Sequence, residues 1–384
     1  MIGPAALAAL SSMSFSVLQR LSSATFSLGR RLAERLGGWV RSRPALAAWV
    51  YPEEPTAETR YREFNGRYFA NFHEQERMLA DKPRMDFYRA AINRHIQPGD
   101  RVVDLGTGTG ILAALASRRG AAQVYAIDHS PILDQARTLA EHNGVKRIEF
   151  IATHSKEFTV NERVDVILHE QMGDCLFDEA MVANVTDLRD RVLRPGGLIL
   201  PSRFEFYCEP IKIRDGRLVP FLWELNVQGY DYSCLERSRP QDPGYYHLCS
   251  SDLGLVEHFL GEPEPALMLD LGTVTGAGLP QELHFSRRVV HAGRLDGYAV
   301  FFRARVDDDL VLSSSPLDPR RAPHWGFRIL RTDRDDFELG DVIEVTLRVG
   351  AWHELDSWRW SHVKRMAAGP HSAEPVGTPG VGSS

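Results

Sequence analysis

Two glutamates nine positions apart, Glu170 and Glu179, are the residues whose type and spacing best suit a chemical role. They belong to the segment 169–179, which directly follows an apolar run at 164–168 that predicts a buried parallel strand. Carboxylates at the C-terminal end of such a strand lie where α/β sheets bind ligands. A pair of them can hold a planar cation through charge-assisted, bidentate hydrogen bonds. The alternative interpretation is that both glutamates are solvated loop acids.

A glycine-rich turn upstream separates an expected strand from an expected helix. The strand covers 101–105, the turn 106–110 and the helix 111–119. Glycines let the backbone approach a ligand, and the helix N-terminus supplies free N–H groups. The next expected strand, 123–127, ends in Asp128, whose carboxylate is placed to bind ribose hydroxyls. This order of elements predicts a nucleotide-type cradle.

The residues of the turn narrow the class of ligand. Asp104 precedes the glycines, and the loop reads Asp-Leu-Gly-Thr-Gly-Thr-Gly instead of the GxGxxG pattern of dinucleotide-binding proteins. With Asp104, Gly106, Gly108 and Asp128 at these positions, the stretch resembles the cofactor loop of S-adenosylmethionine-dependent methyltransferases. The resemblance implies S-adenosyl-L-methionine as the cofactor. The sequence offers no metal-ligand spacing, so no metal is expected.

With both motifs in view, the chain resembles the protein arginine methyltransferases over about residues 61–365. Several further segments carry this resemblance. They are 78–92, similar to the family's helix before the first strand; 193–201, similar to the exit from its cofactor domain; 223–231, similar to the start of its dimerisation arm; and 313–325, similar to the loop that carries Thr-His-Trp.

The resemblance implies roles for individual residues. Glu170 and Glu179 would bind the substrate guanidinium, and His324 paired with Asp81 would relay a proton. Arg84 would grip the cofactor's carboxylate. The full expected cofactor set is Arg84, Asp104, Gly106, Gly108, Asp128 and Ser155, the last at the position that usually offers an acid to adenine. The expected substrate pocket contains Met78, Met172, Asp174 and Trp325.

The chain also departs from the family's pattern. Gln75 stands where the family has a cofactor-contacting histidine, and Phe72 replaces a tyrosine. Inside the 169–179 hairpin, Gln171 and Asp174 replace a tryptophan and a tyrosine, and Asp178 replaces a further aromatic residue. We therefore expect the cofactor chemistry to be kept and the acceptor pocket to be remodelled. The two aspartates would add negative charge near the acceptor entrance and favour substrates with extra basic groups.

Bulk properties set the remaining bounds. The 384 residues are 43% hydrophobic and 25% charged, which fits a globular chain of about two domains. The first 50 residues hold six arginines against one acid, so with −6 overall the remainder carries a net −11 and would attract basic partners. This balance predicts no nucleic-acid partner. The four cysteines lack CxxC spacing, which indicates reduced thiols and a cytoplasmic location.

The pattern predicts an α/β chain of four parts. Residues 61–200 alternate strand and helix, hence a doubly wound, Rossmann-like methyltransferase domain. Residues 201–366 read as an antiparallel β-barrel-like domain. An inserted dimerisation arm at about 221–262 would build a homodimer. A basic extension at 1–60 and a disordered tail at 367–384 complete the chain. The extension is compatible with an amphipathic helix that contacts a membrane surface, with a transit-like segment, or with a helix that packs on the domain.

The aromatic residues expected to anchor the arm on a second subunit are Phe221, Trp223, Tyr230 and Tyr232. The leading functional hypothesis is N-methylation of arginine in a protein or peptide. The runner-up is a methyltransferase of the same architecture that acts on a small molecule or biosynthetic peptide. A third hypothesis is a catalytically silent scaffold, against which the retention of both glutamates and Arg84 argues.

Overall fold

The structure is a computed structural model that describes residues 65–275 and 278–367. All described residues from Gly66 onward belong to one compact unit. The expected basic extension at 1–60 and the tail beyond 367 lie outside the described residues. Within those residues, no helix is long and apolar enough to cross a membrane.

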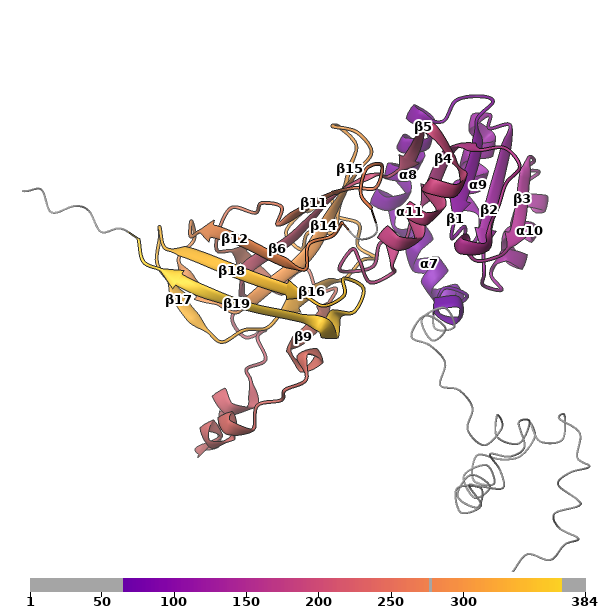
Figure 1. Ribbon diagram of the computed structural model, residues 1–384. Helices are drawn as coiled ribbons and strands as arrows, with labels where there is room; N and C mark the ends of the chain where they lie inside the picture. The colour runs from indigo at the N-terminus through magenta and orange to yellow at the C-terminus, as the bar shows by residue number, and fades with distance from the viewer. Residues whose placement is uncertain (1–64, 276–277, 368–384) are drawn as a thin grey trace, which may run out of the picture. The chain divides into compact units, whose positions relative to one another are not determined.

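The first part of the described chain forms a five-stranded parallel sheet in the order β3-β2-β1-β4-β5 (Figure 1). Its strands are β1 (Arg101–Leu105), β2 (Gln123–Asp128), β3 (Ile148–Ala152), β4 (Val164–His169) and β5 (Leu193–Leu200). The strand order reverses between β1 and β4, which pair in parallel. In open α/β sheets such a switch point, at the carboxyl ends of the strands, is where ligands bind.

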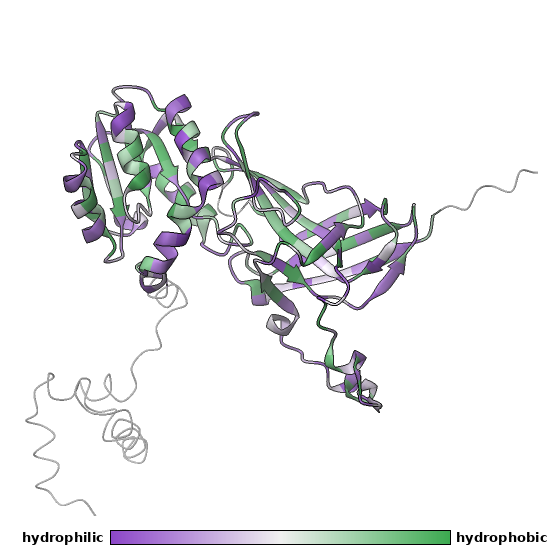
Figure 2. Cartoon of the chain, turned by 180° about the vertical axis from the view of Figure 1, so that it is seen from behind, coloured by the Kyte–Doolittle hydropathy of each residue, from purple (hydrophilic) through white to green (hydrophobic). Residues whose placement is uncertain are grey.

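Two helices, α7 (Phe72–Ala80) and α8 (Lys82–His95), precede this sheet in the chain, and further helices connect its strands. These are α9 (Ile111–Arg119), α10 (Leu133–His142), α11 (Met181–Val192) and the 3₁₀ turn η1 (Ser155–Glu157). Figure 2 shows mostly hydrophobic residues along the sheet strands and a mixture of hydrophobic and hydrophilic residues on the helices. The predicted alternation of strands and helices around a parallel sheet is therefore confirmed in the described part of this region.

The second part of the chain is antiparallel. A seven-stranded sheet contains β6 (Arg203–Ile213), β9 (His247–Ser250), β10 (Val256–Phe259), β11 (Leu267–Asp270), β14 (Gly297–Arg305), β15 (Val311–Ser313) and β16 (Phe327–Leu330). A three-stranded sheet contains β12 (Glu282–Arg288), β18 (Val342–Val349) and β19 (Trp358–Arg365). Two short pairs are β7 (Asn226–Val227) with β8 (Tyr230–Asp231), and β13 (Gly293–Leu295) with β17 (Asp335–Phe337). The 3₁₀ turns are η2 (Leu222–Glu224), η3 (Ser233–Ser238), η4 (Pro243–Tyr246) and η5 (Leu355–Ser357).

An aromatic core fastens the glutamate hairpin to this second part. Phe177, inside the hairpin, packs against Trp352 with ring centroids 4.4 Å apart and against Phe206 of β6 at 5.6 Å. Trp352 and Phe206 in turn contact the fully buried Trp358. Edge and tilted aromatic contacts of this kind stabilise a core beyond simple burial. These contacts fix the position of the 169–179 hairpin relative to the antiparallel sheet.

The inserted arm is shorter than the sequence indicates. Two parts of the range 221–262 form β9, which pairs with β16, and β10, which pairs with β6. Within this range, only 221–246 adds no strand to either of the two larger sheets, and it extends from them (Figure 1). The aromatic residues themselves mark this boundary, because six lie in 221–246 and only Phe259 lies in 247–262.

Two of the four expected interface anchors are buried within the chain itself. Phe221 stacks on Trp223 with centroids 4.7 Å apart, and Arg331 covers the Phe221 ring at 3.8 Å. Stacking and cation–π contact satisfy these rings internally. Tyr230, in contrast, is 72% exposed. The expectation that Phe221 and Trp223 face a second subunit is therefore corrected.

Candidate active site

The sheet register brings the two sequence motifs together. Leu105, the last residue of β1, pairs with His169, the last residue of β4. The residues that follow these two, Gly106 and Glu170, therefore leave the sheet side by side at the switch point. The glycine loop and the 169–179 hairpin therefore start from adjacent strand ends, where α/β sheets bind ligands.

Asp104, the fourth residue of β1, holds the glycine loop in place through hydrogen bonds. Its Oδ2 accepts hydrogen bonds from Thr107 Oγ1 at 2.6 Å and from the backbone N–H of Ala113, in α9, at 3.0 Å. Burial raises the pKa of Asp104 to about 6. Among the described residues Oδ1 has no partner. Asp104 thus shapes the loop with one oxygen and keeps the other free.

Asp128 faces the same loop from the end of β2. Its Oδ2 accepts from the backbone N–H of Gly108 at 2.9 Å and its Oδ1 from that of Ser130 at 2.8 Å. Each carboxylate oxygen has more than one lone pair, so both can accept a further hydrogen bond. The carboxylate is thus oriented and still able to bind a ribose.

The loop conformation requires glycine. Gly106 and Gly108 have φ values of +70° and +54°, in the left-handed region. A Cβ on Gly108 would lie 3.0 Å from Oε1 of Gln75 on α7. Gln75 in turn donates through Nε2 to the Phe69 carbonyl at 2.8 Å. The glycines therefore leave the loop backbone free of side chains, and Gln75 of α7 lies close to it.

Arg84 lies in the first turn of α8, which Asp81 caps by accepting the Arg84 N–H at 3.0 Å. The guanidinium is buried. Its Nε donates to Glu170 Oε1 at 3.1 Å and its Nη1 to the Met78 carbonyl at 2.9 Å. Nη2 has no acceptor within the described part of the chain, so Arg84 retains a donor for an anionic ligand.

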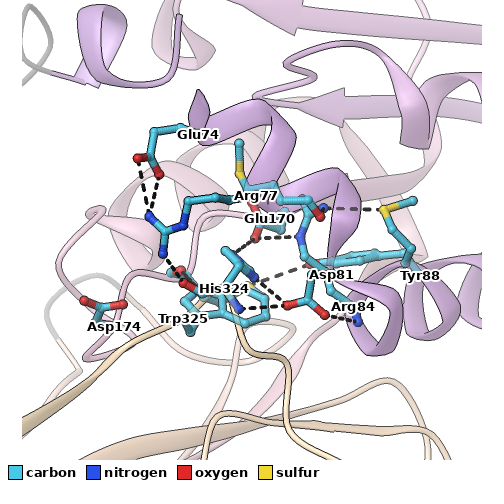
Figure 3. Close-up of polar contacts among 12 residues, drawn as sticks. Glu74, Arg77, Asp81, Arg84, Tyr88, Glu170, Asp174, His324 and Trp325 are labelled. Carbon is cyan, nitrogen blue, oxygen red and sulfur yellow. Dashed lines mark hydrogen bonds and ion pairs between the residues drawn. The ribbon is translucent and has the colours of Figure 1, made fainter. Parts of the chain in front are cut away.

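His324 links Asp81 to Glu170 (Figure 3). Its Nδ1 lies 2.9 Å from Asp81 Oδ2 and its Nε2 lies 3.6 Å from Glu170 Oε1. Burial disfavours the imidazolium, but Asp81 and Glu170 outweigh it and raise the pKa of His324. Burial would raise the pKa of Glu170, but Arg84 and His324 outweigh it, so this pKa is lowered.

The pKa of Glu179 is shifted in the opposite direction from that of Glu170. Burial and then the negative charge of Glu170 raise the pKa of Glu179 well above its ordinary value. No donor among residues 65–275 and 278–367 reaches its carboxylate. The two glutamates are close enough to repel, yet only Glu170 is compensated by Arg84 and His324. An added cation between them would stabilise the ionised form of Glu179.

Trp325, Met78 and Met172, three of the residues expected in the substrate pocket, are all buried. Trp325 is buried, and its Nε1 donates to the Met172 carbonyl at 2.5 Å. Its ring lies 3.9 Å, centroid to centroid, from the His324 ring. Met78 is buried on α7. The Trp325–Met172 bond joins the hairpin to the loop that carries His324.

Asp174 and Asp178 are both partly exposed, and both accept hydrogen bonds from within the chain. Asp174 accepts from the Gly326 N–H at 2.8 Å and from Cys249 Sγ at 3.3 Å. Asp178 accepts from the Cys175 N–H at 3.2 Å, and burial raises its pKa. These contacts orient both carboxylates, and their contribution of negative charge near the acceptor stays a prediction.

Ser155 begins the turn η1 after β3 and is buried. Its carbonyl accepts from Arg191 Nη2 at 2.7 Å. A role of its hydroxyl toward adenine stays a prediction. Throughout the described ranges, no group of three or more His, Cys, Asp or Glu residues is placed to hold a metal ion.

Two residues of this centre were missed by sequence reasoning. Tyr88 donates its hydroxyl to the His169 carbonyl at 2.9 Å, and the Arg84 guanidinium lies over its ring. Arg77 donates to the His324 carbonyl at 2.9 Å and pairs with Glu74 (Figure 3). The spacing of Tyr88, one helical turn after Arg84, was the available signal. Arg77 had none, because its partner is distant in sequence.

Comparisons with known proteins agree with this geometry. A family described as "Methyltransferase domain" matches residues 102–197. Protein arginine N-methyltransferase 6 of Danio rerio is 34% identical over 284 residues, covering 71% of this chain and 78% of that protein. Protein arginine N-methyltransferase PRMT10 of Arabidopsis thaliana is 37% identical over 342 residues, covering 81% and 88%.

Solved structures give the same result. The crystal structure of Arabidopsis thaliana protein arginine methyltransferase 10 in a uniquely open conformation superposes with a TM-score of 0.67 at 25% identity, covering 79% of this chain and 96% of that one. The chain is therefore an S-adenosylmethionine-dependent methyltransferase. It belongs to the protein arginine N-methyltransferase family.

Proposed function

We propose that Glu170 and Glu179 form the guanidinium receptor for methylation of protein arginine, the activity of the family to which the chain belongs. The observation that carries this assignment is the charge asymmetry of the pair. Glu170 is compensated by Arg84 and His324, whereas burial and Glu170 raise the pKa of Glu179. A guanidinium is the planar, permanently charged group that would satisfy both carboxylates.

The crevice fits S-adenosylmethionine. Asp128 has oriented oxygens for a ribose, the loop is bare at Gly106 and Gly108, and Arg84 keeps Nη2 for a carboxylate. When bound, this cofactor supplies a methyl group on a sulfonium. The chain's own contribution is positioning and charge compensation, since a second cation must approach the first in a dry site.

His324 is assigned to proton removal. Methylation of a protonated guanidinium leaves one proton too many on the nitrogen that receives the methyl group. His324 Nε2 faces Glu170 and its Nδ1 is held by Asp81, so neutral His324 can accept that proton through Glu170. Asp81 then stabilises the imidazolium.

The experiment uses matched peptides. A Gly-Arg-rich peptide should gain methyl groups on arginine, detected by mass spectrometry, whereas the same peptide with citrulline in place of arginine should not. Citrulline keeps the shape of the side chain and lacks its charge. Equal methylation of both peptides, or of neither, contradicts the assignment of the glutamate pair.

We also propose a cytoplasmic homodimer assembled through the arm, residues 221–246. Tyr230 together with Leu222 and Val227 supports this, since these apolar side chains are exposed on it. Tyr230→Ser with Val227→Ser should give monomers in light scattering, and persistence of dimers in this variant contradicts the proposal.

A further inference from the structure

Gln171 is the first residue after Glu170, and it lies on the glycine loop. Its Nε2 is 3.9 Å from the position that a Cβ on Gly106 would take. The register of β1 with β4 explains this, because Gly106 and Glu170 leave the sheet side by side. The side chain therefore belongs to the cofactor crevice as well as to the glutamate hairpin.

The carbonyl oxygen of this carboxamide is enclosed and unpaired. Gln171 Oε1 is shielded from solvent and receives no hydrogen bond from the residues that the structure describes. Burying such an acceptor without a donor is costly, so native proteins rarely leave one unsatisfied. An unpaired acceptor in a binding crevice indicates that the ligand brings the donor.

The surroundings of Gln171 select the kind of donor. Its neighbour Glu170 contacts Arg84, whose free Nη2 suits a carboxylate. The amino-acid end of the cofactor carries an ammonium next to its carboxylate. Arginine can only donate hydrogen bonds, so it cannot bind that ammonium. Gln171 Oε1 is an unpaired acceptor on the hairpin side of the glycine loop, next to the residue that contacts Arg84.

We propose that the Gln171 carbonyl binds the α-ammonium of the cofactor's amino-acid end, and that Gln171 thereby sets selectivity for this end. The inference rests on the assigned cofactor. A substrate guanidinium is the other donor near this hairpin, and the proximity of the Gln171 side chain to Gly106 favours the cofactor. That second assignment is an outcome of the test.

The test compares S-adenosylhomocysteine with its deaminated analogue, in which hydrogen replaces the amino group, by titration calorimetry. Wild type should bind S-adenosylhomocysteine about 10- to 100-fold more tightly than the analogue, the range of a hydrogen bond to a charged group. Gln171→Met, of similar size but without a strong acceptor, should reduce this ratio to about 1–3.

Gln75→Met is the matched control. Gln75 is a second carboxamide on the loop, but its Nε2 is bonded to the Phe69 carbonyl. The Gln75→Met variant should keep the wild-type ratio of the two ligand affinities, even if it binds both ligands more weakly. If Gln171→Met does not fold, Gln171→Glu provides the test. A carboxylate binds an ammonium more strongly than a carboxamide does, so this variant should prefer S-adenosylhomocysteine over the deaminated analogue by a larger factor than wild type.

An unchanged ratio in Gln171→Met, or in Gln171→Glu, overturns the proposal. So does weaker binding of an arginine peptide with an unchanged cofactor ratio, which would assign Gln171 to the acceptor. Absence of S-adenosylhomocysteine binding by wild type would instead contradict the cofactor assignment itself, so the two failures are distinguishable.

Discussion

His324 and Asp81 are 243 positions apart, yet the ring Nδ1 and the backbone N–H of His324 both reach Asp81 Oδ2, at 2.9 and 3.1 Å. Asp81 also caps α8, so one carboxylate orients both the helix that carries Arg84 and the imidazole that faces Glu170. Arg84 and His324, which we propose for cofactor binding and proton transfer, are thereby positioned by a single side chain.

Replacing Asp81 by Asn tests this link. Asn is as good an N-cap as Asp, so α8 should persist while the negative charge is lost. The pKa of His324, which Asp81 raises, should then fall. Because neutral His324 accepts the proton, the acid limb of the kcat/KM profile should move to lower pH. kcat should drop by about 10²-fold.

The control for this variant is Asp86→Asn, also on α8, where the carboxylate is exposed and pairs with Lys82 and Arg89. It should leave the pH profile unchanged. An unmoved acid limb in Asp81→Asn would show that Asp81 does not tune His324.

Binding of the arginine substrate should release a proton from Glu179. Its pKa is raised in the free site by burial and by Glu170, and an arriving guanidinium lowers it. Calorimetry in two buffers of different ionisation enthalpy, between about pH 5 and 8, measures that proton. Glu179→Gln should abolish the release. Proton release that survives in Glu179→Gln would assign it to another group.

Asp128→Ala should weaken cofactor binding by about 1.5–3 kcal/mol, the range for hydrogen bonds to a charged group. The loss combines the ribose contact with the orientation of Gly108. Asp134→Ala is a matched control, because Asp134 is largely exposed on α10 and pairs with Arg137. Affinities that match in the two variants, measured by calorimetry, would remove Asp128 from the cofactor site.

Asp174→Ala should lower kcat without changing cofactor affinity. It removes the acceptor of the Gly326 N–H, and with it one of the ties between the hairpin and the loop that carries His324. The free energy of unfolding should fall by about 1–3 kcal/mol, because a buried donor loses its partner. Asp174→Asn, which keeps an acceptor oxygen, should recover most of the rate. A preference for extra basic residues that disappears in Asp174→Asn would instead support the entrance-charge interpretation.

Much of the site could be predicted from the sequence because local patterns specify local elements. The apolar run before Glu170 and the glycine turn after β1 placed both motifs at the carboxyl ends of parallel strands, where they meet. The pairing of His324 with Asp81 came from the family resemblance alone, since no local pattern encodes a contact across 243 residues.

The corrected expectation for the arm has a physical cause. Phe221 and Trp223 are aromatic residues that are buried within the chain, and Phe221 is covered by Arg331. Residue type suggested that they face a second subunit, but the tertiary contacts that decide exposure are invisible in the local sequence.

The most direct test of the guanidinium receptor follows labelled methyl groups from S-adenosylmethionine into arginine of the chain's protein substrates. Proteins are hydrolysed after reaction, and methylarginine is quantified by mass spectrometry for wild type, Glu170→Gln and Glu179→Gln. Wild type should form methylarginine, and each variant should lose about 10²–10³ in rate, the effect of removing a preorganised charge in a dry site. Near wild-type methylarginine formation by both variants would contradict the account.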